Sequence, residues 1–519
     1  MGVVFQRQTI IYCNMRAVPS ITTMTPEQIL RKKPFCVPVP NNYKGTPIFM
    51  GQGLDVQIPE GIQFINRTQS DFIREWFPSS HAINSILYYP NRIGQGQDGK
   101  MKAKVHTRIA IAYQQMIKTK RKTALAGNNV GMRLIANKNN QKHEDFLARV
   151  REGWEESNME IAIDKCLNSD FITGDCAVYV YLTEGGKRVG WRTFSYLEGD
   201  TLYPHFHPYT GEICLLGREY TEDDDDGNPV RYLDVIDDKY FATFKLGGDS
   251  ADEKWEMVGD PIAHGFNFCP VAYHRSTGPV WYPSQSLIDS QEMSLSQFAE
   301  NNLSYGLRIL YTLGAEFELE TEADGTPTHI DSPDPNAKVG YLENAEGADG
   351  AFAKQLEIGH KNIMRCSFAV ETPEVKSGAD MSSLTVKMLF ADSYIKAIED
   401  SQEYQLFLDR VLALFMFAYG ICTDMTKDLR DVKIKPYLDP FVFMSETEVV
   451  NALVQLTAAG VLSRRTATEI AYNSGYGTAA EYERVLQQEH DELVASAGVQ
   501  QQTTGRKNVV SASRTGNEQ

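Results

Sequence analysis

The chain has 519 residues, of which 42% are hydrophobic and 23% charged, which is ordinary for a globular protein with material for roughly two to four domains. Its formal net charge of −17 excludes the basic proteins that bind DNA tightly by neutralising phosphates. The eight cysteines include no CxxC pair, which argues against a zinc module or a disulfide framework and fits folding in a reducing cytoplasm.

The first half of the chain passes from an irregular arm through helices to strands. Residues 1–67 mix Pro, Gly and short apolar runs and are expected to form an extended arm. Helical spacing of apolar residues then predicts helices over 70–88, 105–118 and 146–168. Val- and Tyr-rich runs alternate with Gly- and Pro-containing turns over 171–273, and this pattern predicts a β-meander.

A small strand-rich segment separates the next two predicted helices. Ser284 can cap a helix that reaches about Ser304, and a second helix is expected from Phe352 to Cys366. Between them, short apolar runs and turn residues predict strands over 307–342. The sequence therefore predicts a β module inserted between two helices.

The longest predicted helix follows, because neither Gly nor Pro occurs from Met381 to Tyr419. At about 1.5 Å per residue it would be roughly 55–60 Å long. Its apolar residues step by four and three and form two seams. The seams are Leu384, Met388, Ala391, Ile395 and Ile398, then Tyr404, Leu408, Val411, Phe415 and Ala418.

These two seams are out of phase, since six rather than seven residues separate the last member of one from the first of the other. A bend or a change of packing partner is therefore expected near Ser401. The segment from Val411 to Tyr419 is apolar nearly all round and should be buried. It is too short to cross a bilayer, which needs about 20 apolar residues.

The end of the chain predicts a strand over 432–436 and then three short helices before residue 496. Ser445 and Thr478 begin capping boxes, and Gly460 is placed to end a helix. The polar segment 497–519 is expected to be disordered.

No motif in the sequence makes a strong case for catalysis. Gly94–Gly99 matches GxGxxG but follows no clear strand, so a polar loop is the preferred interpretation. His205 and His207 lie between prolines with no third ligand nearby, which favours a turn. The acidic run 222–226 lacks the glutamate that would complete a calcium loop and is interpreted as a hairpin tip. The sequence contains no P-loop, HExxH or GxSxG, so no catalytic residue, metal site or cofactor is expected.

The order of these parts resembles the portal proteins of tailed bacteriophages, in the branch found in long-tailed siphophages. The similarity covers about residues 70–495. The matching segments are Tyr88-Tyr89, Gly174–Tyr179, His264–Tyr273 with its G-x-x-P-V-like strand, Ser377-Gly378 before Leu384-x-x-Lys387, and Gly460–Thr466 with Glu481–Arg484.

The resemblance implies an α+β phage portal fold with wing, stem, clip and crown regions and a long kinked tunnel helix. The implied regions are an N-terminal arm (1–67), the wing (68–282), two stem helices (283–305 and 351–372), the clip (306–350), the tunnel loop and long helix (373–421), a wing return strand (422–445), the crown (446–496) and the tail (497–519).

The resemblance also implies a non-enzymatic, ring-shaped, dodecameric channel at one capsid vertex. Such a channel serves DNA packaging by the terminase motor, head–tail joining and genome ejection. The expected partners are further copies of the chain, the terminase large subunit, the major capsid or scaffolding protein, a head–tail adaptor and double-stranded DNA that passes without sequence specificity. No membrane is expected, and the protein would belong to the virion after assembly in the host cytoplasm.

Two sets of residues are candidates for these contacts. Those proposed to face DNA in the channel are Lys361, Arg365, Lys376, Lys387 and Lys396, which on the sequence alone are also typical of a solvated helix surface. Those proposed to dock the motor on the clip are Arg308, Tyr311, Glu316, Glu318 and Tyr341.

Two alternative functions remain open. One is a nucleotide- or metal-dependent enzyme that uses Gly94–Gly99 or His205 and His207, and the other is a different oligomeric head–tail connector protein.

Overall fold

The computed structural model of the chain describes residues 20–40, 64–95, 101–127, 129–135, 141–183, 186–224, 226–247, 253–306, 309–313, 318–321, 327–331, 338–342, 346–371, 383–423, 432–440, 446–462 and a few single positions beyond. The chain forms two compact units. Unit 1 consists of Met1–Thr372 and Asp392–Phe441, and unit 2 of Pro373–Ala391 and Val442–Gln519.

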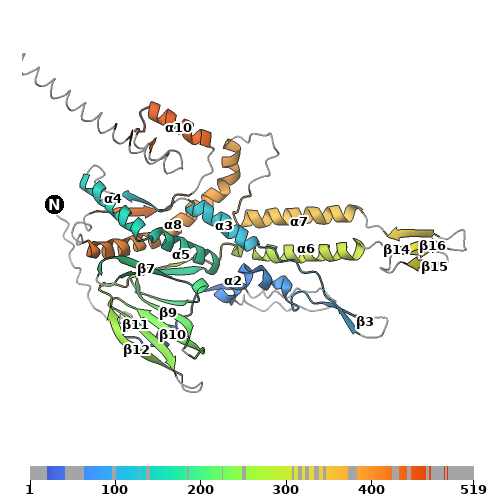
Figure 1. Ribbon diagram of the computed structural model, residues 1–519, viewed down its shortest axis with the longest axis horizontal. Coiled ribbons are helices and arrows are strands. Elements are labelled where there is room, and N and C mark those ends of the chain that lie inside the picture. Colours follow the sequence, from blue (N-terminus) through green and yellow to red (C-terminus); the bar gives the residue numbers. More distant parts are fainter. Residues whose placement is uncertain are drawn as a thin grey trace, which may run out of the picture. The chain divides into compact units, whose positions relative to one another are not determined.

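Unit 1 mixes helices and strands, so the predicted α+β class is confirmed (Figure 1). Its helices are α1 (Pro26–Leu30), α2 (Gln69–Trp76), α3 (Tyr113–Ala126), α4 (Gln141–Glu156), α5 (Met159–Thr173), α6 (Gln285–Gly306) and α7 (Glu346–Cys366). The long helix α8 (Ser383–Cys422) begins in unit 2 and continues into unit 1.

The strands of unit 1 pair into several antiparallel sheets. They are β1 (Cys36–Pro40), β2 (Phe64–Thr68), β3 (Arg92–Gln95), β4 (Met101–Lys104), β5 (Gly131–Leu134), β6 (Asp175–Leu182), β7 (Val189–Phe194), β8 (Thr201–Phe206), β9 (Ile213–Asp223), β10 (Pro229–Ile236), β11 (Tyr240–Gly247), β12 (Lys254–Ala263), β13 (Val271–Arg275), β14 (Ile309–Leu313), β15 (Glu318–Thr321), β16 (Pro327–Asp331), β17 (Lys338–Leu342) and β18 (Ile434–Tyr437).

The predicted β-meander is confirmed. Strands β8 to β12 form a five-stranded antiparallel sheet in which each strand pairs with the next in the sequence. A second sheet has the order β13–β6–β7. Buried residues of both sheets, among them Ala177, Leu216 and Val271, belong to one apolar cluster. The two sheets therefore share a core, and successive residues of one strand face different clusters, since Leu215 belongs to another apolar cluster than Leu216.

Two of the predicted helices are shorter than expected. The helix predicted over 70–88 ends at Trp76, and two 3₁₀ turns follow it. Pro78 explains the break, because proline cannot donate the backbone hydrogen bond that would continue the helix. The helix predicted over 146–168 is divided into α4 and α5 at Asn158, which has φ of 54°. Asparagine tolerates this left-handed backbone conformation better than most residues.

The prediction of a helix over 105–118 is wrong in its first half, where residues 105–112 have no helical structure. The backbone N–H groups of alternate residues in this segment donate to side chains on one face of α6. These contacts are Thr107 N to Glu300 Oε2 (3.3 Å), Ile109 N to Ser296 Oγ (2.9 Å) and Ile111 N to Glu292 Oε1 (2.8 Å). Two residues of extended chain advance about 6.6 Å and four residues of helix about 6 Å, so the two repeats match. Side chains of α6 thus satisfy backbone donors that a helix would have used internally.

The second apolar seam of α8 is confirmed as a core element. Each of its five members, Tyr404, Leu408, Val411, Phe415 and Ala418, is at most 2% exposed. They belong to the largest apolar cluster of unit 1, together with residues of α4, α5 and β6. This cluster explains why so apolar a segment is stable in a chain with an ordinary overall composition.

The first seam is wrong as a prediction of the buried face. Ile395 is 58% exposed and Ile398 is 36% exposed. The buried side of this part of α8 runs instead through Ala397 and Asp400, and the Asp400 carboxylate accepts a hydrogen bond from Arg121 of α3. The buried stripe therefore continues in phase into the second seam, and the described residues show no change of buried face near Ser401. The kink itself stays a prediction.

The segment Phe390–Cys422 of α8 is long and apolar enough to cross a membrane by length and composition. Buried core helices pass the same test. The contacts of this segment with the main apolar cluster favour a core helix.

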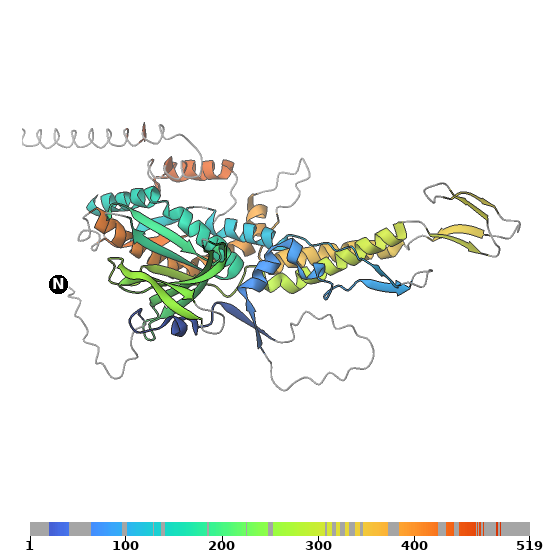
Figure 2. The same cartoon turned by 60° about the horizontal axis from the view of Figure 1, so that its bottom comes forward.

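Helices α6 and α7 pack side by side, as the two views agree (Figures 1 and 2). The rings of Phe298 and Phe352 stack with centroids 5.8 Å apart, and Gln291 Nε2 donates to the backbone oxygen of Leu356 at 2.7 Å. Gly359 lies against Gln291, and a Cβ atom at this position would collide with that side chain. These contacts hold the two helices together near the ends from which the β module is inserted.

The β module consists of two ladders. Strand β14 pairs with β17, and β15 pairs with β16. The ladder β14–β17 closes the module at its base, because Ile309 pairs with Leu342. The strand-rich segment predicted between two helices is therefore present.

Within the described part of unit 2, α10 (Glu446–Ala458) is the longest element that lies entirely in this unit. It ends before Gly460, whose φ is 69°, and Val461 N donates to the backbone oxygen of Leu456 at 3.0 Å. Gly460 therefore terminates a helix as predicted, because glycine adopts the left-handed conformation without strain. The capping residues Ser445 and Thr478 and the tail 497–519 lie outside the described residues.

Candidate functional site

Two of the predicted DNA-contact residues, Lys361 and Arg365, lie one turn apart on α7 and are exposed. Lys361 Nζ is 2.5 Å from Glu357 Oε1 on the same helix. Arg365 has no ion pair among the described residues. An exposed ion pair is worth little energy, but it does place a carboxylate beside the cation. Arg365 is therefore the better placed of the two for contact with an anionic ligand.

Lys396 on α8 is held by two carboxylates, with Nζ 3.0 Å from Glu399 and 3.2 Å from Asp400. Burial alone would lower the pKa of Lys396, but these two acidic partners outweigh it and raise the pKa. Asp400 also pairs with Arg121. Much of the charge of Lys396 is thus balanced inside the protein, which argues for a structural role.

The remaining two predicted channel residues have no described side chains. Lys387 lies within α8, and Lys376 lies outside the described residues. The described residues therefore do not bring the five lysines and arginines together, and their role in contacting DNA stays a prediction.

The predicted docking residues fall on the β module. Tyr311 lies in β14, Glu318 in β15 and Tyr341 in β17, whereas Arg308 and Glu316 lie outside the described residues. Tyr311 pairs with Gly340, and Leu310 pairs with Tyr341. Paired residues share a face and successive residues alternate, so the two tyrosines lie on opposite faces of the ladder.

One face of the β15–β16 ladder is acidic, a feature that the sequence prediction missed. Glu318 pairs with Asp331 and Glu320 pairs with His329, whereas the opposite face carries Leu319 and Ile330. The register therefore gathers Glu318, Glu320 and Asp331 on one face of the ladder. The alternation E-L-E in β15 already indicated that Glu318 and Glu320 share a face. Only the register with β16 shows that Asp331 lies on the same face.

The histidines that suggested an enzyme have structural partners. His205 Nε2 lies 3.3 Å from the backbone oxygen of Ile29, and burial followed by the nearby Lys32 lowers the pKa of His205. His207 Nδ1 accepts the backbone N–H groups of Tyr209 and Thr210 at 3.3 and 3.2 Å. The interpretation of this segment as a turn is wrong for His205, which lies in β8 and pairs with Leu215, and it holds only from His207, where the turn after the strand begins.

The other two motifs are described only in part. Gly94 and Gln95 belong to β3, and residues 96–100 lie outside the described part of the chain. In the acidic run, Asp224 Oδ1 accepts the N–H groups of Asp226 and Asn228, so it shapes the tip between β9 and β10. Among the described residues, no group of three His, Cys, Asp or Glu is arranged to hold a metal ion.

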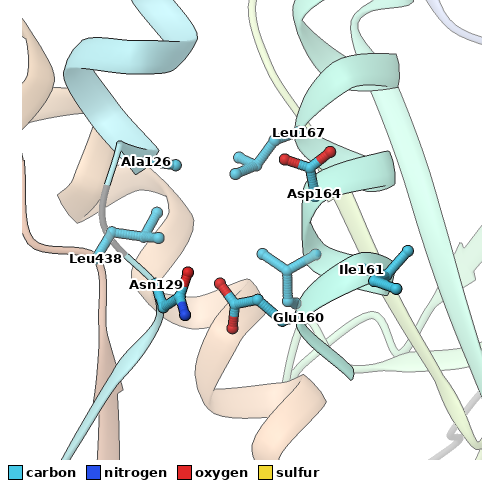
Figure 3. Close-up of a pocket in the computed structure, with 8 residues that line it drawn as sticks. Ala126, Asn129, Glu160, Ile161, Asp164, Leu167 and Leu438 are labelled. Atoms are coloured by element: carbon cyan, nitrogen blue, oxygen red, sulfur yellow. The ribbon is translucent and has the colours of Figure 1, made fainter. Parts of the chain in front are cut away.

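A cavity of about 260 Å³ lies between α3, α5 and the segment after β18 (Figure 3). Its lining residues are Ala126, Asn129, Glu160, Ile161, Ile163, Asp164, Leu167 and Leu438. Glu160 accepts the N–H of Val130 at 3.0 Å, and Asp164 pairs with Lys122 at 2.5 Å. Both carboxylates are therefore used to join neighbouring elements, and no nucleophile–base pair lines this cavity.

Two buried carboxyl groups join distant elements of unit 1. Asp170 of α5 accepts a hydrogen bond from the Tyr404 hydroxyl of α8. Asp175 of β6 accepts from Gln69 Nε2 at 2.6 Å and from the Tyr273 hydroxyl at 3.2 Å. Burial raises the pKa of Asp170 and raises the pKa of Asp175 to about 7. Near neutral pH the proton on Asp175 is therefore coupled to folding.

The stability of the protein should fall as pH rises through the range in which Asp175 titrates. The folded-state pKa of about 7 lies above the ordinary value of 3.8, so this contribution is full below pH 3.8 and is lost as pH rises to about 7. The loss is about 1.4 kcal/mol per pH unit at most. Asp175→Asn cannot titrate, so the free energy of unfolding of the wild type minus that of the variant should decrease between about pH 5 and 7. Parallel pH curves for the two proteins would contradict the assignment.

The sequence and the structure were compared with known proteins and protein families. The sequence pattern of the family described as "Phage portal protein, SPP1 Gp6-like" matches residues 80–492. No curated protein matches the chain.

Solved structures of gene transfer agent particles resemble the chain weakly. A chain from the neck of an empty GTA particle, computed with C6 symmetry, is 12% identical, with 70% of this chain and 90% of that chain covered and a TM-score of 0.34. A chain from the virion of a native gene transfer agent particle is 12% identical, with coverages of 70% and 89% and a TM-score of 0.33. A third, from the neck of a native GTA particle computed with C12 symmetry, is 10% identical, with coverages of 69% and 88% and a TM-score of 0.29.

Proposed function

This chain belongs to the phage portal protein family, SPP1 Gp6-like, and we propose that it forms a ring-shaped, dodecameric channel at one vertex of a phage capsid. The observation that carries the proposal is the family match over residues 80–492, which begins before α3 and extends beyond α10. The insertion of a β module between α6 and α7 and the long helix α8 after them support it. Assembly would take place in the host cytoplasm, and the finished ring would remain in the virion.

In this proposal the elements of the chain correspond to the regions of a portal subunit. The sheets and helices of residues 68–282, with the return strand in 422–445, form the wing, and α6 and α7 form the stem. The β module is the clip, residues 373–421 line the channel, and 446–496 form the crown. DNA enters during packaging and leaves during ejection through the common bore. The energy for packaging comes from ATP hydrolysis by the terminase motor, so the portal itself need not be an enzyme.

We infer that the acidic face of β15–β16 takes part in docking the motor. Glu318, Glu320 and Asp331 share this face, and a complementary partner would present Lys or Arg to them. The same module would receive a head–tail adaptor after packaging. A capsid or scaffolding protein would surround the ring at the vertex.

The proposal is tested first by the assembly state of the purified protein. Native mass spectrometry should give about twelve times the 58.3 kDa mass of one chain, and negative-stain images should show rings with a central hole. A stable monomer that binds nucleotide or metal stoichiometrically would instead favour an enzyme. Rings that are never incorporated at a capsid vertex would favour another connector protein.

Charge reversal at the proposed channel should reduce DNA retention more than ring assembly. Lys376→Glu and Arg365→Glu each replace an attraction to phosphate by a repulsion, so several-fold less DNA per particle is expected. Lys361→Glu should have a smaller effect, because Glu357 already balances this charge. Lys254→Glu on exposed β12 is the matched control. Particles of all variants are assayed for nuclease-protected DNA, and equal contents would remove Lys376 and Arg365 from the channel.

A further inference from the structure

Strands β3 and β4 form a ribbon that belongs to no larger sheet (Figure 1, at the label β3). In its register Arg92 pairs with Lys104 and Gly94 pairs with Lys102. Paired residues lie on the same face of an antiparallel ladder, and alternate residues of one strand share a face. Arg92, Lys102 and Lys104 therefore lie on one face of the ribbon, with Gly94 among them.

The opposite face has a different chemistry. Ile93 pairs with Ala103, and Gln95 pairs with Met101. The eight residues of the two strands thus include three cations and no anion, in a chain whose formal charge is −17. A solvated surface in such a chain would be expected to carry carboxylates as well. The concentration of one sign on one face points to an anionic ligand.

The base of the ribbon is firmly attached to the rest of unit 1. Arg108 Nη2 donates to the backbone oxygen of Tyr89 at 2.9 Å and to Asn91 Oδ1 at 2.7 Å, which joins the two ends of the ribbon. The ring of Tyr89 stacks on that of His106 with centroids 4.7 Å apart. After His106, the N–H groups of Thr107, Ile109 and Ile111 donate to side chains of α6.

This attachment uses buried polar side chains. Glu292 and Ser296 are fully buried, and both accept backbone donors from the segment that follows the ribbon. A backbone donor bonded to a buried side chain has no water to exchange with, so these two contacts hold the segment after the ribbon against α6. The cationic face is thus presented from a fixed base, which reduces the ordering cost of binding.

We propose that the β3–β4 ribbon is a sequence-independent binding site for the phosphate backbone of double-stranded DNA. The inference rests on the proposed function, which supplies DNA as the partner. Lysine acts as a point charge toward phosphate, and arginine can bind it with two donors. The cationic face carries no amide side chain for reading base edges, and the two strands contain no aromatic residue on which unpaired bases could stack. A two-stranded ribbon also fits a groove of duplex DNA, and Gly94 allows a close backbone approach.

The full-length protein provides the test, with a labelled DNA duplex of about 30 base pairs titrated between about 50 and 200 mM salt. Lys102→Glu with Lys104→Glu should weaken binding about tenfold or more and reduce the slope of log K against log salt by about 1 for each lysine. Lys102→Gln with Lys104→Gln should give an intermediate loss. The matched control is Lys239→Glu with Lys254→Glu, which makes the same charge change on exposed positions beside β11 and β12. This control should alter affinity and slope little.

Three outcomes would overturn the proposal. The first is equal affinity and slope for the ribbon pair and the control pair. The second is tighter, ribbon-dependent binding of single-stranded than of double-stranded DNA. The third is unchanged DNA binding while the ribbon pair loses incorporation into capsids, which would assign the ribbon to an acidic protein surface. Rings are scored separately by native mass spectrometry. Wild-type protein that forms no ring refutes the proposed function, whereas intact rings without ribbon-dependent DNA binding refute only the ribbon site.

Discussion

Removing residues 307–345 and joining the chain with a short Gly-Ser linker should leave ring assembly intact and abolish DNA packaging. Ile309 pairs directly with Leu342, so the two ends of the module lie next to each other and a short linker can close the gap. Helices α6 and α7 keep their own contacts, including Phe298 with Phe352. Packaging is lost because the proposed docking surface of the motor is removed.

The deletion is measured in two assays. Negative-stain images score ring assembly, and nuclease-protected DNA per particle scores packaging, which should fall to background. A graded version keeps the module and reverses its acidic face with Glu318→Lys and Glu320→Lys, while Glu318→Asp and Glu320→Asp serve as the matched control. Packaging at the wild-type level by the deletion variant would show that the module is not the docking clip.

Replacing Phe415 by Ala should lower the free energy of unfolding by about 3–5 kcal/mol. Its side chain is 0% exposed in the main apolar cluster. Its ring meets Trp154 of α4 edge-on with centroids 5.3 Å apart and stacks on Tyr419 at 5.6 Å. The substitution removes the transfer energy of the ring and leaves a cavity, because rigidly packed neighbours on two helices cannot collapse into the space.

Leu406→Ala on the same helix is the matched control. Leu406 is 81% exposed, so its loss should change stability by no more than about 0.5 kcal/mol. Both variants are compared with the wild type by denaturant unfolding followed by circular dichroism and by the fluorescence of the five tryptophans, which include Trp154. Similar midpoints for the two variants would mean that the α8 core contributes little to the stability of unit 1.

Local patterns in the sequence were enough for elements whose own residues decide their structure. The β-meander follows from alternating runs and turn residues, and the end of α10 follows from Gly460. The seam from Tyr404 to Ala418 is buried because five large or apolar side chains on one stripe can leave water only against a core. The order of parts also indicated the portal family, which the match over 80–492 shows.

Apolar spacing failed where a polar group made the decisive contact. Ile395 and Ile398 belong to an apparent seam, yet Asp400 faces the protein because Arg121, 279 residues away in the sequence, pairs with it. An aspartate is expected to be exposed, because burying an unpaired carboxylate is costly, and its burial can be predicted only when its partner is known. The prediction of DNA-facing cations met the same difficulty. Neighbouring carboxylates balance the charges of Lys361 and Lys396, and the pattern of basic residues alone did not show this.

The amino-acid sequence by itself determined the class of the fold, its family, the meander and the core seam of α8, because these depend on contacts between near neighbours and on the amount of apolar surface to be buried. Only the tertiary structure decided that residues 105–112 are not helical, since the N–H groups of Thr107, Ile109 and Ile111 bond to side chains of α6 more than 180 residues away. It also decided which charges gather on one face, because the pairing of β3 with β4 and of β15 with β16 sets that arrangement. The α6 contacts join residues that no local window of sequence contains together. The two hairpins are local, but a shift of one residue in the pairing would move every side chain to the other face, and the folded chain sets that register.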